Sequence, residues 1–200
     1  MGKIFCIMGK SSSGKDTVYK KLLSQKDFSL SPIIPCTTRP KRKEEVPGID
    51  YHFYTEQELH KLESEGKIIE LRSYRTIHGI WYYFTPDDGH IDLSRNHYLM
   101  IGTLDSYLKL KEYFGKDRII SIYLQTEDGI RLQRALDRER RQESPKYAEL
   151  CRRYLADEQD FSQERLKKAE IEKIFQNREL SQVINEISHY IRKKIKEDLS

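Results

Sequence analysis

Nine consecutive residues near the start of the chain combine glycines, hydroxyls and a lysine at fixed intervals. A glycine, four further residues, a second glycine and a lysine form the spacing of a loop whose backbone N–H groups cradle phosphates. The lysine adds a cation for the outer phosphates. Asp16 stands where this pattern has a hydroxyl residue. The spacing predicts a nucleoside triphosphate site made by Gly9, Lys10, Ser11, Ser12, Ser13, Gly14, Lys15, Asp16 and Thr17.

The residues on either side of this loop suit it. The apolar run from Lys3 to Met8 is typical of a buried parallel strand. After Gly14, the residues Val18, Leu22 and Leu23 fall on one face of a helix. The N-terminus of that helix would add its partial positive charge at the place where the loop binds an anion.

Composition excludes several classes of protein. Two hundred residues fit one α/β domain with insertions. Lys and Arg (36) exceed Asp and Glu (32) by only 4, which does not indicate a nucleic-acid partner. Cys6, Cys36 and Cys151 have no paired spacing, so we expect a reducing, cytoplasmic location. We expect neither a signal peptide nor a membrane-spanning helix, and therefore no membrane partner. The sequence does not indicate a protein partner.

Periodicity divides the rest of the chain into three kinds of segment. We expect core elements in 1–35, 86–126 and 169–200, a small mixed or antiparallel insert in 36–85, and a charged helical segment in 127–168. Helices are predicted at 56–65, 104–114 and 180–195, and two more in 127–168 on either side of Ser144–Pro145. Strands are predicted at 31–35, 49–54, 68–74, 80–84, 98–101, 119–124 and 173–175.

The segment from Cys36 to Phe53 resembles the nucleoside-monophosphate insert of guanylate kinases. The family pattern is matched at Thr37, Thr38, Arg39, Arg42, Glu45, Gly48, Asp50, Tyr51 and Phe53. With the phosphate loop and the order of elements, the resemblance covers nearly the whole chain. It implies an α/β P-loop kinase fold: a parallel core sheet flanked by helices, an inserted GMP-binding subdomain and a helical lid.

The resemblance also implies how an acceptor would be held. Arg39, Arg42 and Tyr51 would clamp the monophosphate, since two arginine forks and a hydroxyl suit a phosphate dianion. Glu45 belongs to the same motif, and the resemblance places it among the GMP-binding residues. Tyr83, or alternatively Tyr82, would be the second tyrosine of the clamp. Glu70 would read the base, since a carboxylate can accept both N1–H and N2–H of guanine. Thr85 would lie near guanine O6.

Three positions depart from the family pattern. Pro35 replaces a serine that touches the base, and Met100 and Gly102 replace two acids, one of which contacts guanine. These changes weaken the expected discrimination against AMP. Because the acids are missing, we hypothesise that Asp16 takes over their task toward the Mg²⁺ that accompanies ATP, with Thr17 as the competing ligand.

Two further contacts follow from the resemblance. Lid arginines would stabilise charge on the transferred phosphoryl group. Arg138 aligns with the arginine that ends the first lid helix, and Arg152 or Arg153 with the one that begins the second. Asn177 corresponds to an asparagine that contacts the adenine of ATP.

The resulting hypothesis is ATP-dependent phosphorylation of GMP, and of dGMP, to GDP by direct in-line transfer. ATP and GMP would be the partners, Mg²⁺ the cofactor, and Lys15, Arg39, Arg138 and Arg153 the catalytic residues. Two alternatives remain open. One is a ribose 1,5-bisphosphate phosphokinase, since such enzymes resemble guanylate kinases and can carry Gly-Lys-Asp in the loop. The other is a non-catalytic guanylate-kinase-like binding module.

Overall fold

A computed structural model gives the arrangement of these elements, and it describes residues 1–43, 45–76, 79–171 and 173–197. Five parallel strands form one sheet in the order β2-β7-β1-β8-β9, and four strands form a second, mixed sheet in the order β4-β3-β6-β5. The strands are β1 (Ile4–Met8), β2 (Leu30–Pro32), β3 (Cys36–Thr37), β4 (His52–Phe53), β5 (Ile68–Thr76), β6 (Gly79–Pro86), β7 (His97–Ile101), β8 (Ile119–Gln125) and β9 (Ile174–Gln176).

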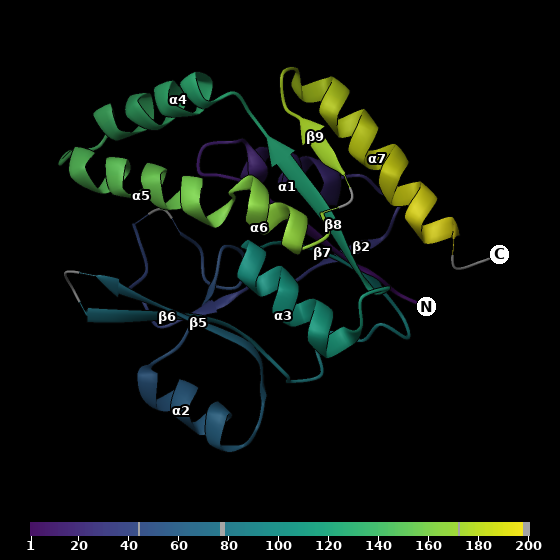
Figure 1. Cartoon of the computed structure of the whole chain (residues 1–200). Coiled ribbons are helices and arrows are strands. Elements are labelled where there is room, and N and C mark those ends of the chain that lie inside the picture. Colours follow the sequence, from purple (N-terminus) through teal and green to yellow (C-terminus); the bar gives the residue numbers. More distant parts are fainter. Residues whose placement is uncertain (44, 77–78, 172, 198–200) are drawn as a thin grey trace.

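Helices cover both faces of the parallel sheet. They are α1 (Lys15–Leu23), α2 (Glu56–Ser64), α3 (Leu104–Phe114), α4 (Asp128–Arg140), α5 (Tyr147–Asp160), α6 (Gln163–Lys168) and α7 (Leu180–Lys196). The α/β fold with a parallel core sheet and a second mixed sheet is therefore confirmed. In Figure 1 the mixed sheet and α2 lie at one end of the molecule, and α4 and α5 run side by side at the other. Within the described residues, no helix combines the length and apolar character that a membrane span needs.

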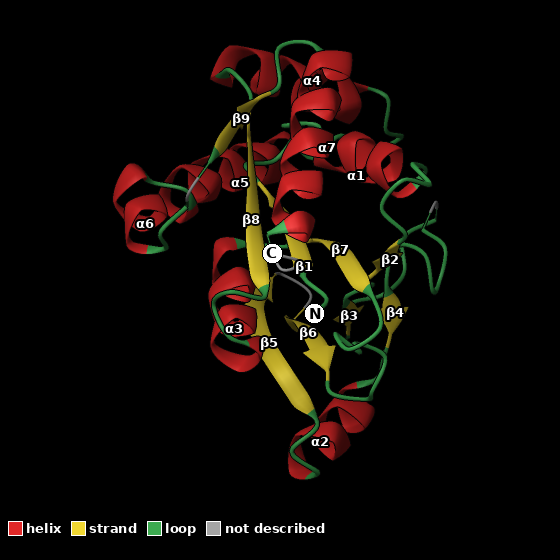
Figure 2. Cartoon of the chain, turned by 90° about the vertical axis from the view of Figure 1, so that its right-hand side faces the viewer, coloured by secondary structure: helices red, strands yellow, loops and turns green. Residues whose placement is uncertain are grey.

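The central strand β1 shows why the core has two halves. Phe5 and Ile7 point into a cluster that includes α1 and α7, whereas Ile4, Cys6 and Met8 point into a cluster that includes α3. Alternate side chains of a strand face opposite sides of its sheet, so an apolar run requires cover on both sides. Figure 2 shows the strands between these helices. The loop after β1 is thus carried by a fully buried strand.

The mixed sheet uses the same alternation to separate two functions. Tyr82 and Phe84 of β6 pack with Leu59 of α2 in a third apolar cluster. Tyr83 and Thr85 alternate with them and face the other side, where Glu70 of β5 lies directly opposite Thr85. One face of this sheet is therefore core, and the other carries polar side chains.

Three predictions about the elements need correction. The strand expected at 49–54 is only His52–Phe53, because Gly48 adopts a left-handed φ of 78° and Val46 donates to the Asp50 carboxylate in a tight turn. The segment 127–168 holds three helices, since Ser162 caps a separate α6 after α5. The strand expected at 31–35 is β2, which ends at Pro32. The other predicted helices and strands are confirmed within about two residues at each end.

Gly102, at the end of β7, has no room for a side chain. A Cβ there would lie 2.7 Å from Cys6 Sγ and 2.7 Å from Ser106 Oγ. Both neighbours are buried, and Ser106 is held in the capping box of α3 with Thr103. An acid at position 102 is therefore incompatible with this packing.

We expect Gly102→Ala to lower the free energy of unfolding by about 1–3 kcal/mol, because overpacking strains a close-packed interior. That loss would lower Tm by roughly 2–4 °C per kcal/mol in a chain of this size. Thermal unfolding followed by circular dichroism measures it. Adding Cys6→Ala should restore part of the stability. A single variant as stable as the wild type would contradict the packing argument.

Candidate functional site

The loop between β1 and α1 has the backbone that its glycines predict. Gly14, the N-cap of α1, has a φ of 93°, and Ser12 also lies in the left-handed region at 61°. A Cβ on Gly14 would lie 2.6 Å from the Asn177 amide nitrogen, and a Cβ on Gly9 would lie 2.4 Å from the Leu124 carbonyl oxygen. Close neighbours and a left-handed backbone together explain why glycine occupies both ends of the loop.

Lys15 lies over the loop with its ammonium group turned inward. Its Nζ donates to the carbonyl oxygens of Gly9 (2.8 Å) and Lys10 (3.0 Å). Burial lowers the pKa of Lys15, and the carboxylates of Asp16 and Asp157 oppose that shift. The hydroxyls of Ser12 and Ser13 are buried and have no hydrogen-bond partner within the described structure. A buried hydroxyl without a partner costs about 1–3 kcal/mol, so the loop is suited to receive an oxygen-rich anion.

Two side chains brace the loop from outside. Thr126, after β8, and Asn177, after β9, both donate to the Ser13 carbonyl oxygen, at 2.9 and 2.8 Å. Both residues are buried. Asn177 therefore lies against the loop, and contact with adenine is still only a prediction for it.

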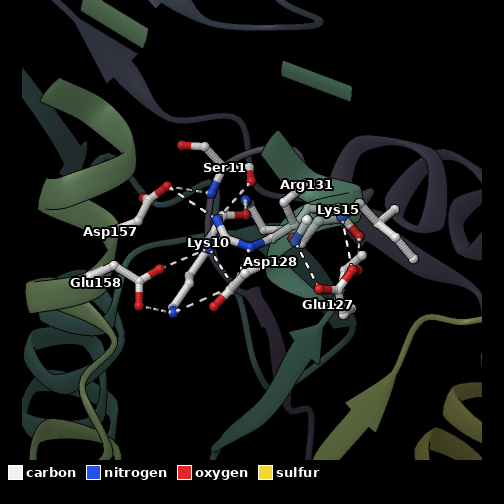
Figure 3. A network of polar contacts seen from close by, with 12 residues as sticks. Lys10, Ser11, Lys15, Glu127, Asp128, Arg131, Asp157 and Glu158 are labelled. Atoms are coloured by element: carbon white, nitrogen blue, oxygen red, sulfur yellow. Dashed lines mark hydrogen bonds and ion pairs between the residues drawn. The ribbon is translucent and has the colours of Figure 1, made fainter. Parts of the chain in front are cut away.

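Carboxylates of α5 reach into the loop in this structure. The Ser11 backbone N–H donates to Asp157 Oδ2 at 2.7 Å, and Lys10 Nζ donates to Glu158 at 2.5 Å. Figure 3 shows both acids pointing from α5 toward the loop. The loop's donors thus already hold negative oxygens, which stand in chemically for phosphate.

Arg131 of α4 contacts the loop and the acids of both α4 and α5. Its guanidinium, 1% exposed, donates to Asp128 (2.6 Å), Glu158 (2.8 Å) and the Ser11 carbonyl oxygen (3.3 Å). None of Arg131, Asp157 and Glu158 was singled out in the sequence analysis. Asp128 precedes Arg131 by three positions, a spacing that favours an ion pair on a helix. Nothing in the sequence indicated that the acids of α5 would complete it.

Arg138 and Arg153 come together, whereas Arg152 does not join them. Arg138 and Arg153 line the same small cavity as Ser11 and Arg131. Burial and the positive charge of Arg138 lower the pKa of Arg153. Arg152 instead pairs with Glu149 on the exposed side of α5. Of the two alternatives for the second lid arginine, Arg153 lies near the loop.

Arg39 is fixed in the insert by hydrogen bonds and by an aromatic ring. Its guanidinium donates to both Glu45 oxygens, at 2.7 and 2.5 Å, and its Nε donates to the Tyr83 hydroxyl at 3.1 Å. The Tyr51 ring lies 4.7 Å from the guanidinium carbon. Burial alone would lower the pKa of Arg39, but Glu45 and Tyr83 raise it above its ordinary value. Arg39 is thus a fixed, permanently charged fork.

The remaining residues of the predicted clamp gather around Arg39. The rings of Tyr51 and Tyr83 meet edge to face at 5.9 Å. Tyr82 lies in the apolar cluster on the other side of the sheet, so Tyr83 is the tyrosine beside Arg39. The side chain of Arg42 is exposed, and its backbone N–H donates to Glu45 at 2.9 Å. Burial and the positive charges of Arg138 and Arg42 lower the pKa of Arg153.

Glu70 and Thr85 form the buried end of this polar face. Each is 2% exposed, and the Thr85 hydroxyl donates to Glu70 Oε1 at 3.0 Å. Arg72, two residues along β5, also donates to Glu70, through Nε at 2.9 Å and Nη2 at 3.2 Å. Sequence reasoning did not single out Arg72. The i, i+2 spacing that places Arg72 beside Glu70 on a strand was the available signal.

Asp16 and Thr17 are exposed in the first turn of α1. Among the described residues, no group of three or more His, Cys, Asp or Glu side chains could hold a metal ion by itself. Mg²⁺ at nucleotide sites uses one or two carboxylates and takes its other ligands from phosphates and water. Asp16, next to Lys15 at the helix N-terminus, fits that requirement.

Comparisons with known proteins agree with this geometry. The sequence profile described as guanylate kinase matches residues 1–84. The guanylate kinase of Thermotoga maritima is 34% identical over 127 residues, and that of Malacoplasma penetrans is 29% identical over 132 residues. Over these residues the chain is similar to guanylate kinases.

The match to the family's sequences is partial, whereas the fold match is nearly complete. The aligned region spans 62% of this chain but about half (49%) of the T. maritima relative, and 62% of the M. penetrans relative. The crystal structure of guanylate kinase from Anaplasma phagocytophilum superposes with a TM-score of 0.67, over 96% of this chain and 86% of that one, at 23% identity. The likeness in fold thus extends beyond the region of recognisable sequence similarity.

We expect Asp157→Asn to strengthen the binding of a non-hydrolysable ATP analogue. The asparagine can still accept the Ser11 N–H, but the negative charge that a triphosphate would meet is gone. Removing an interaction worth about 1 kcal/mol corresponds to roughly a fivefold lower Kd. Isothermal titration calorimetry measures this change.

Asp160→Asn is the matched control for this variant. Asp160 lies on the same helix but pairs with Arg165. Its substitution should leave the Kd unchanged. Equal or weaker binding by Asp157→Asn would show that the acid does not compete with the triphosphate.

Proposed function

We propose that the chain catalyses ATP-dependent phosphorylation of GMP, and of dGMP, to GDP. The observation that carries this proposal is the polar face of the mixed sheet. There the Arg39–Glu45–Tyr83 cluster lies two residues along β6 from the buried Glu70–Thr85 pair. A phosphate fork at one end and a base-reading carboxylate at the other suit a nucleoside monophosphate. The loop around Lys15 suits the triphosphate donor.

The proposed chemistry is a direct in-line transfer. An oxygen of the acceptor phosphate forms the new bond to the γ-phosphorus of ATP as the bond to the β,γ-bridging oxygen breaks, and ADP leaves. The attacking oxygen is already anionic, so no general base is needed. Lys15 and the loop N–H groups would hold the donor phosphates. Arg39, Arg42 and Tyr51 would hold the acceptor, and Arg138 and Arg153 would stabilise charge on the transferred group.

Mg²⁺ would accompany the ATP and neutralise charge on its phosphates. Asp16 is the residue that we assign to the ion or its water shell, since the family's two acids are replaced by Met100 and Gly102 in this chain. Thr17 is the competing ligand. One residue further along a helix turns its side chain about 100° away, which favours Asp16.

The alternatives differ in the acceptor. A ribose 1,5-bisphosphate phosphokinase would have no base to place against Glu70, so its acceptor would give this end of the polar face no role. A non-catalytic module would not need Lys15 or a fixed Arg39. The proposed cell compartment is the cytoplasm, where the three free cysteines Cys6, Cys36 and Cys151 would remain reduced.

Release of ADP in the presence of GMP, dGMP, AMP and ribose 1,5-bisphosphate tests the assignment. We expect turnover with GMP and dGMP, and Arg39→Lys should lower kcat/KM for GMP about 100-fold, since an ammonium cannot form the bidentate fork. KM for ATP should change little. The control is Arg95→Lys, an exposed arginine paired with Asp92. Turnover with ribose 1,5-bisphosphate alone would refute the proposal in favour of the phosphokinase. GMP binding without turnover would refute it in favour of the non-catalytic module.

Asp16→Ala tests the magnesium assignment. We expect a lower kcat and a higher Mg²⁺ concentration for half-maximal rate, because a carboxylate ligand is lost. Thr17→Ala addresses the competing ligand. Asp27→Ala removes an acid that follows α1 and pairs with Arg192, and it should have no effect. A rate and Mg²⁺ dependence unchanged by Asp16→Ala would rule Asp16 out.

A further inference from the structure

The carboxylate at the base end of the acceptor site is already largely occupied. Glu70 Oε1 accepts from the Thr85 hydroxyl at 3.0 Å and from Arg72 Nη2 at 3.2 Å. Glu70 Oε2 accepts from Arg72 Nε at 2.9 Å. An ionised carboxylate has about four acceptor positions, two on each oxygen. One position, on Oε2, has no donor among the described residues.

Arg72 is positioned from several sides. Its Nη1 donates to Thr103 Oγ1, in the N-cap of α3, at 3.1 Å. Burial alone would lower the pKa of Arg72, but Glu70 and Tyr74 raise it. The contacts to Thr103 and Glu70 use three of the five guanidinium N–H groups, so N–H groups remain for a ligand. The side chain of Arg72 is 14% exposed and that of Glu70 is fully buried, so separating them would strand a charge.

Arg72 also lies between the two ends of the polar face. In the β5–β6 register it is opposite Tyr83, which contacts Arg39, while Glu70 is opposite Thr85. A nucleotide whose phosphate is held at Arg39 and whose base reaches Glu70 must pass Arg72. The base end therefore presents an acceptor and a donor side by side.

We propose that Arg72 determines the base specificity of the acceptor site, which reads the O6 and N1–H edge shared by guanine and hypoxanthine. The proposal rests on the function given above, in which Glu70 accepts N1–H. With one acceptor position, Glu70 takes that single N–H. The neighbouring Arg72 N–H can pair only with an acceptor, and beside N1–H that acceptor is O6.

Two consequences follow for substrates. The 2-amino group of guanine is not read by Glu70, so IMP is an acceptor as well as GMP. Adenine presents a bare nitrogen at position 1, which faces the Glu70 carboxylate unfavourably, so AMP is rejected. The site thus selects 6-oxopurine nucleoside monophosphates as a class.

The experiment compares kcat/KM for GMP, IMP and AMP in the wild-type chain and in Arg72→Gln and Arg72→Ala. The wild type should use IMP within about tenfold of GMP, since a site loses little when it does not read the missing group. The Arg72 variants should favour GMP over IMP by at least a further tenfold. Glu70 then gains acceptor positions for N2–H, which guanine has and hypoxanthine lacks, whereas the loss of the O6 partner affects both nucleotides alike. Arg75→Gln, an exposed arginine of the same strand, should leave the ratio unchanged.

Several results would overturn the inference. One is a wild-type kcat/KM for IMP more than 100-fold below that for GMP. Another is a GMP-to-IMP ratio of kcat/KM that neither Arg72 variant changes. A third is a kcat/KM for AMP equal to that for IMP. Thermal unfolding of each variant checks its fold, and the wild-type ratio still decides if both variants unfold. Absence of turnover with every nucleoside monophosphate is a separate result, which refutes the proposed function instead.

Discussion

Concentrated positive charge at the phosphate loop is the constraint on which this structure depends. The N–H groups of a left-handed turn, the N-terminus of α1 and Lys15 lie together in this loop, and Arg131 of α4 contacts it from 120 positions further along the chain. Negative groups stabilise a site of this kind. In this structure the negative groups are Asp157 and Glu158 of α5. The electrostatics of the loop therefore helps to fix the position of α4 and α5. A triphosphate bound in place of these acids would weaken that attachment.

The second constraint is the alternation of side chains in the mixed sheet. Tyr82 and Phe84 pack against α2, and the alternate residues of β6, Tyr83 and Thr85, face the opposite side of the sheet. One short hairpin thus supplies its own apolar support and a row of polar groups. Because a slip of one residue would exchange the two faces, the positions of Arg72 and Glu70 follow directly from packing on the other side.

The local features of the chain could be predicted from its sequence. Periodicity located β1, α3 and α7, because each has an uninterrupted apolar pattern with the period of its own secondary structure. The Arg39–Glu45 pair follows from six residues of separation within one motif. The contacts of α5 with the loop could not be predicted, because they join residues about 146 positions apart. Charge on a helix face does not distinguish an acid in water from one that meets a cation across the molecule.

Three arginines in this site are paired with carboxylates, and the pairs differ in what a ligand would do to them. Arg39 meets Glu45 through one edge of its fork and is held by Tyr83 and Tyr51, so the pair orients a permanent charge. Arg131 shares its carboxylates with the loop, and those acids occupy donors that phosphate would use. Arg72 takes up most of the acceptor capacity of Glu70 without blocking all of it. The same kind of ion pair therefore preorganises one end of the site, competes for ligand at another, and narrows what the base end can recognise.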